Sequence, residues 1–222
     1  MRAHFTAIAG LFLATSAFGW MSVFAMSQPA HQDSIGIEGD FSFDAGCVQH
    51  LASVAGYAWA DSGPATDDGN GSLLQVGFTS YDVCNNVFLV GASGRLSVQD
   101  VQLSENLSTG VLRATGIVLE SVSGNELPVV VDLEFTGTGR HFHDALQIPG
   151  PGECTTGVEG VIAPCNRTLH GRDGVLIGTL SLGSTDYESL GSNFAFGRRT
   201  RSTCIMPDGI PGSACQLFEF PF

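Results

Sequence analysis

The chain has no lysine and carries little charge of either sign. Its nine basic residues are all arginines, they face 22 acidic residues, and charged residues make up 14% of the 222-residue sequence. A formal net charge of −13 repels anionic phosphate backbones, so nucleic acid is not an expected partner. The 29 glycines indicate many turns between strands rather than solvated helices.

Helical periodicity and recognisable catalytic motifs are also missing. After the first 25 residues, no stretch of about eleven residues shows the spacing of an amphipathic helix. The segment Gly91–Gly94 lacks the spacing of a G-x-S-x-G nucleophile elbow, and no closely spaced cysteine pair suits zinc. Sequence motifs therefore define no chemistry.

The amino terminus predicts export. Arg2 precedes an apolar run over residues 7–25, and Val23-Phe24-Ala25 fits a signal-peptidase site, so we predict a signal peptide of residues 1–25. An uncleaved anchor is the alternative, because the run is long enough to span a bilayer. The polar stretch 26–34 favours cleavage. We expect a secreted, periplasmic or cell-surface protein, one domain over residues 26–222, with no transmembrane segment after cleavage.

Six cysteines follow the signal, an even number that predicts three disulfides in an oxidising compartment. Ten loop-like residues separate Cys154 from Cys165, and ten separate Cys204 from Cys215, which favours pairing within each of these segments. The third pair follows from a long hairpin described below. The predicted disulfides are Cys154–Cys165, Cys204–Cys215 and Cys47–Cys84.

Alternation of apolar and polar residues dominates the mature chain and predicts strands. The strand at 51–59 and the strand at 74–78 flank a turn-rich loop, which places Cys47 nearly opposite Cys84. Residues 141–165 are expected to be an irregular excursion. Further strands are expected at 35–43, 87–92, 96–103, 111–120, 129–135, 175–182, 193–205 and 216–222. The fold class is all-β, a single-domain antiparallel β-sandwich or β-barrel of about ten strands, stapled by disulfides.

Residues 131–139 read V-D-L-E-F-T-G-T-G and precede His141-Phe142-His143, while residues 80–84 read S-Y-D-V-C. Over residues 41–152 the sequence resembles a loose group of uncharacterised exported bacterial β-rich proteins. This resemblance implies the fold, and it implies no activity and no catalytic residue.

His141 and His143 are the sharpest candidates for a metal site. Residues two apart on a strand point to the same face, so both imidazoles could reach one transition metal ion. Asp144 could be a further ligand or orient a histidine, and His170 or Glu153 could complete the site. The alternative is a pair of histidines on an exposed strand end.

Asp67, Asp68 and Asn70 could present oxygen ligands to calcium from the loop 61–71. The alternative is that these residues only satisfy turn geometry.

Arg198, Arg199 and Arg201 form the one basic cluster. On a strand, Arg199 and Arg201 share a face and Arg198 lies on the other. They are expected to pair with local acids or to bind an anionic ligand such as an acidic glycan.

Three functions are compatible with these patterns. The first is a non-catalytic extracytoplasmic interaction or structural module with an unknown protein or glycan ligand. The second is a metal-dependent enzyme or metal-binding domain that uses His141 and His143. The third is an outer-membrane barrel, suggested by alternating Phe218, Phe220 and Phe222, although Pro221 interrupts that strand.

Overall fold

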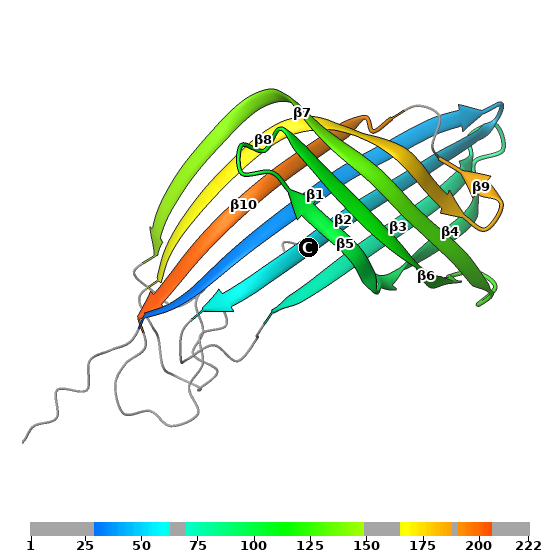
Figure 1. The fold of residues 1–222 in the computed structure, drawn as a ribbon. Coiled ribbons are helices and arrows are strands. Elements are labelled where there is room, and N and C mark those ends of the chain that lie inside the picture. Colours follow the sequence, from blue (N-terminus) through cyan, green and yellow to red (C-terminus); the bar gives the residue numbers. More distant parts are fainter. Residues whose placement is uncertain (1–28, 63–69, 149–164, 188–190, 206–222) are drawn as a thin grey trace, which may run out of the picture.

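The computed structural model describes residues 29–62, 70–148, 165–187 and 191–205. All regular structure within these ranges is β-strand, and ten strands form one antiparallel sheet (Figure 1). The strands are β1 (Pro29–Ala45), β2 (Val48–Ser62), β3 (Gly71–Asp82), β4 (Val87–Leu96), β5 (Val98–Leu103), β6 (Thr109–Glu120), β7 (Glu126–Ile148), β8 (Cys165–Leu182), β9 (Thr185–Asp186) and β10 (Phe194–Ile205). The predicted all-β class is confirmed.

The sheet closes on itself and is therefore a barrel rather than a sandwich. Strand β10 pairs with β1 on one side and with β8 on the other, which joins the two ends of the order β10-β1-β2-β3-β4-β6-β7-β8. The β4–β6 junction is short, with only Ala92↔Glu120 and Ser93↔Leu119 in register. Strand β5 pairs with β6 and also contacts β1, β2 and β3, so this part of the wall lies close to the opposite wall (Figure 1).

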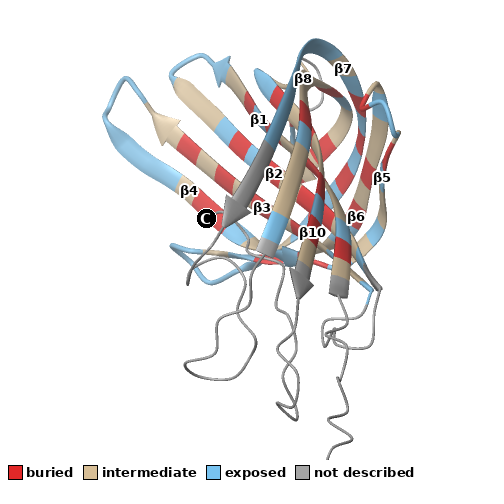
Figure 2. Ribbon diagram, turned by 90° about the vertical axis from the view of Figure 1, so that its left-hand side faces the viewer, coloured by how far each residue is buried: buried red, intermediate tan, exposed pale blue. Residues whose placement is uncertain are grey.

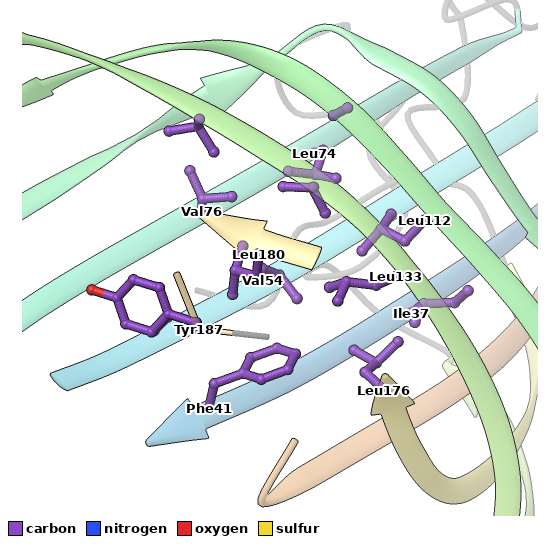
Figure 3. Close-up of a cluster of buried hydrophobic side chains, with 14 of the residues drawn as sticks. Ile37, Phe41, Val54, Leu74, Val76, Leu112, Leu133, Leu176, Leu180 and Tyr187 are labelled. Carbon is purple, nitrogen blue, oxygen red and sulfur yellow. The ribbon is translucent and has the colours of Figure 1, made fainter. Parts of the chain in front are cut away.

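The core fills the inside of the barrel. Alternate residues are buried along most of β3 and from Val129 to Phe135 of β7, and buried residues form red bands on the barrel wall in Figure 2. Leu74, Leu112, Leu133 and Leu176 are fully buried side chains from four different strands, and they meet in the interior (Figure 3). Burying one such leucine contributes about 1.5–3 kcal/mol. The barrel centre is therefore packed, and open space lies towards its ends.

The Cys47–Cys84 disulfide is confirmed. It joins the turn between β1 and β2 to the segment after β3, with a Cα–Cα distance of 5.4 Å. The Val83 N–H donates to the Cys47 carbonyl at 2.8 Å, so the ladder of the β2–β3 hairpin continues to the disulfide. The long hairpin brings these cysteines together.

The other two predicted disulfides stay predictions. Cys154 and Cys215 lie outside the described residues. Cys165 begins β8 and is directly opposite Cys204 of β10 in the backbone register. This register makes the two backbones neighbours, but it does not establish a pairing.

The expected irregular excursion at 141–165 is wrong for residues 141–148, which continue β7, and for Cys165, which begins β8. The register shifts between Gly137 and His141, where β7 carries two more residues than the facing part of β8. Such a bulge interrupts the alternation on which the prediction depended. The ladder then resumes with His141 opposite Arg172.

The predicted signal peptide and the predicted strand 216–222 lie outside the described residues and stay predictions. In the part of the chain that is described, no helix could span a membrane.

Candidate functional site

One row of residues crosses four neighbouring strands at the end of the barrel where β1 begins. His143 of β7 faces His170 of β8, His170 faces Arg199 of β10, and Arg199 faces Ile35 of β1. Residues directly opposite in an antiparallel ladder point to the same side of the sheet. Ile37, two residues after Ile35, is completely buried in the core, so this row faces the barrel interior.

A cavity of about 500 Å³ opens at this end. Its polar lining includes Asp33, Thr168, His170, Arg199 and Arg201, and Ile35 and Ala58 provide apolar wall. We call this cavity the cationic mouth. It combines two guanidinium groups and an imidazole with one carboxylate, although the chain as a whole is strongly acidic.

Arg201 is already paired. Its Nε and Nη2 donate to the two carboxylate oxygens of Asp33 at 2.7 and 3.2 Å, a bidentate arrangement. The hydrogen bond and charge of Asp33 raise the pKa of Arg201. Asp33 therefore neutralises Arg201 at the rim, and it leaves no carboxylate for the second arginine.

Arg199 has no counter-charge in the described part of the chain. Its Nη2 donates to the Leu103 carbonyl at 2.8 Å, and its buried Nε has no hydrogen-bond partner. The Nε of Arg172, two residues from His170 on β8, is likewise buried and unpartnered. A partly buried guanidinium without a counter-ion is costly, so an anion that enters the cavity beside Arg199 would be stabilised there.

Arg198 lies on the outside of the barrel, on the face opposite Arg199 and Arg201, and the alternation along β10 predicted that these two faces differ. Its Nη2 lies 3.1 Å from Glu38, and its guanidinium lies 5.1 Å from the centre of the Tyr57 ring. The Tyr57 hydroxyl donates to Glu38 at 2.7 Å, and burial, followed by Glu38, raises the pKa of Tyr57. This arginine has structural partners and is not available to the cavity.

The candidate metal ligands are only partly brought together. The rings of His143 and His170 lie 4.3 Å apart between centroids, while His141 faces Arg172 one row away. Asp144 faces Leu169, so strand alternation puts it on the other side of the sheet from His143. His143 and His170 are therefore the pair that could hold a metal, and the predicted set of His141, His143 and Asp144 stays a prediction.

One group of three metal-type donors occurs within the described ranges, namely Cys47, Asp82 and Cys84. Both cysteines are in the disulfide, so their sulfur atoms are not thiolate ligands. Of the calcium candidates, Asp67 and Asp68 lie outside the described residues, and Asn70 is exposed just before β3. The calcium site also stays a prediction.

The alternation of residues predicted that Arg199 and Arg201 share a face, and His170 was considered as a metal ligand, but neither the pairing of His170 with Arg199 nor the role of Asp33 was predicted. Asp33 and Arg201 are 168 positions apart in the chain. The pairing of β10 with β1 brings them together, and no local sequence pattern predicts that pairing.

Comparison with known proteins gives little. No family model matches the chain, and no curated protein matches it. A solved structure of the enduracididine biosynthesis enzyme MppR, complexed with the condensation product of pyruvate and imidazole 4-carboxaldehyde, is 10% identical. The alignment covers 80% of this chain and 87% of that one, with a TM-score of 0.20.

The expectation of a non-catalytic interaction or structural module is corrected. The finding that contradicts it is the match to an enzyme. At a TM-score of 0.20, this likeness assigns neither a fold nor an activity to this chain.

Proposed function

We propose that the protein binds a small molecule carrying an oxyanion, a carboxylate or a phosphate, in the cationic mouth. Arg199 provides the main charge contact. His170, the next residue in the row, is placed to donate a hydrogen bond to the same anion or to exchange a proton with it. The observation that carries the proposal is the Arg199 guanidinium, which has a carbonyl partner but no described carboxylate.

The electrostatics of the whole chain support a selective site. With a net charge of −13, most of the molecule repels anions. Arg199 lies against a wall that includes Ile35 and Ala58, and low-dielectric surroundings strengthen the attraction of a bound anion. A hydrogen bond to a charged group contributes roughly 1.5–3 kcal/mol. Losing it should weaken binding by about tenfold to a hundredfold.

Calorimetric titration of the mature domain with citrate and with inorganic phosphate tests the proposal. The key variant is Arg199→Leu, and the matched control is Arg198→Leu, which removes the neighbouring charge on the outside of the barrel. We expect saturable binding that Arg199→Leu weakens at least tenfold and that Arg198→Leu leaves within a factor of two to three. Equal losses in both variants would show that only the overall charge matters, and they would refute the site.

A transition metal held by His143 and His170 is a second candidate, favoured by the 4.3 Å between their rings. Two imidazoles are one ligand short of the three that catalytic zinc sites use, so we rank it second. Metal analysis of protein prepared without chelator or affinity histidines tests it. Near-stoichiometric metal that is lost on His143→Ala and His170→Ala would support this candidate, and metal-free folded protein would exclude it.

A further inference from the structure

The opposite end of the barrel carries a second group of polar side chains. His50 of β2 and Ser80 of β3 face each other in register, and the His50 Nδ1 lies 2.8 Å from the Ser80 hydroxyl oxygen. His50 also faces Phe43 of β1, ten residues after Asp33, which is roughly 33 Å along the strand. This pair is therefore separate from the cationic mouth.

The orientation of the His50 ring is fixed by aromatic packing. It stacks on Phe43 with 4.6 Å between centroids and meets the edge of Tyr187 at 6.1 Å. No carboxylate in the described ranges contacts the imidazole. The arrangement is therefore a serine–histidine dyad in which stacking, rather than an acid, orients the base.

Tyr187 completes the group. It follows the short strand β9, is only 3% exposed, and its backbone N–H donates to the Leu180 carbonyl at 2.7 Å. Its ring lies 5.3 Å from the Phe43 ring and 5.4 Å from the Phe78 ring, and Figure 3 shows its hydroxyl at the edge of the apolar cluster. Burial raises the pKa of Tyr187, so the phenol stays protonated at neutral pH and can donate a hydrogen bond.

Ser80 and His50 line a cavity of about 420 Å³ together with Tyr187. The remaining wall is largely apolar and includes Leu127 and Leu182. The β3–β4 register shifts immediately after Ser80, so the regular ladder is interrupted beside the hydroxyl. Bulges are frequent next to active sites because they redirect a side chain or end the pairing.

We propose that Ser80 is a nucleophile activated by His50, and that this second cavity hydrolyses small esters with an apolar acyl group. The Ser80 oxygen would attack the ester carbonyl carbon while its proton passes to His50 Nδ1. The C–O bond to the alcohol then breaks, and the departing alkoxide takes the proton from His50. Water hydrolyses the acyl-serine by the same route and restores the free hydroxyl.

Tyr187 is placed to stabilise the intermediate. Its ring lies 6.1 Å from the His50 ring and lines the same cavity as Ser80, so its hydroxyl can donate to an oxyanion that forms there. The apolar wall favours a short aliphatic acyl chain over a charged one. This activity does not depend on anion binding at the other end.

The direct test is covalent labelling of the intact mature domain with a fluorophosphonate, which loses fluoride to a nucleophilic serine. Peptide mass spectrometry then identifies the labelled residue. We expect label on Ser80 in the wild-type protein and the same rate of labelling in Thr79→Ala, the neighbouring residue on the outward face. No label on Ser80 in folded wild-type protein would overturn the proposal without the need for any variant.

His50→Phe separates activation from packing, because the aromatic ring keeps the stack on Phe43 and removes the base. We expect this variant to label at least tenfold more slowly and to lose p-nitrophenyl butyrate hydrolysis. Tyr187→Phe should lower the hydrolysis rate and leave the domain folded. Labelling of His50→Phe at the wild-type rate would show that Ser80 is not activated by the histidine and would refute the dyad.

Discussion

Replacing Cys47 and Cys84 together by serine removes the disulfide that ties the β1–β2 turn to the end of β3. The cysteines are separated by 37 positions, and the chain-entropy model gives about 4 kcal/mol for closing a loop of that size. The β2–β3 ladder and the hydrogen bond from Val83 to residue 47 involve only backbone atoms, so the variant should still fold. For a domain of this length, the melting temperature should fall by about 8–16 °C.

Urea unfolding of residues 26–222, followed by circular dichroism, measures this loss. The matched control is Val83→Ser, an exposed residue beside Cys84 whose replacement should change stability by less than about 0.5 kcal/mol. A loss below 1 kcal/mol in the double-serine variant would contradict the expected contribution of the crosslink. It would mean that the hairpin ladder, and not the crosslink, limits the freedom of this segment in the unfolded chain.

Two further predictions concern the barrel wall. Leu133→Ala should lower the free energy of unfolding by about 3–5 kcal/mol because Leu133 is fully buried. Asp132→Ala, on the outer face of the same strand, should lower it by less than about 1 kcal/mol. Similar losses in the two variants, measured by urea unfolding, would contradict the assigned faces. Burial raises the pKa of Tyr57, aided by Glu38, and burial raises that of Tyr187, so the folded chain retains protons that the unfolded chain loses above about pH 10. The free energy of unfolding should be highest below that pH and should decrease as the pH rises through the pKa values of the two tyrosines in the folded chain. Tyr57→Phe should make this decrease smaller. The same decrease in the wild type and in Tyr57→Phe would contradict this expectation.

The strands were predictable where alternation is unbroken. Residues 129–135 have apolar residues at every second position, and all four of these are buried, including Val131 and Leu133. In the strand 35–43, Ile37 and Phe41 are buried, while Ile35 and Phe43 pack against the core and are partly buried. The continuation of β7 to Ile148 was not predictable, because the bulge between Gly137 and His141 interrupts the alternation of apolar and polar residues that marks a strand. Local patterns therefore located most strands but not the full length of the most irregular one.

The sites depended on pairings that the sequence does not contain. Alternation alone could put Arg199 and Arg201 on one face, but only closure of β10 onto β1 puts Asp33 beside Arg201 and leaves Arg199 uncompensated. Likewise, no sequence motif contains His50 and Ser80, and only the register of β2 against β3 makes them a hydrogen-bonded pair. In a barrel, such sites arise from long-range register.

The central claim is that the cationic mouth binds an oxyanion through Arg199. Nuclear magnetic resonance of the labelled mature domain, titrated with citrate, observes arginine Nε–H and histidine ring signals separately. We expect shifts at Arg199 and His170 that saturate together, while Arg198 on the outer face and His50 at the other end stay unchanged. Shifts spread evenly over Arg198 and Arg199, or no saturable shift at Arg199, would contradict it.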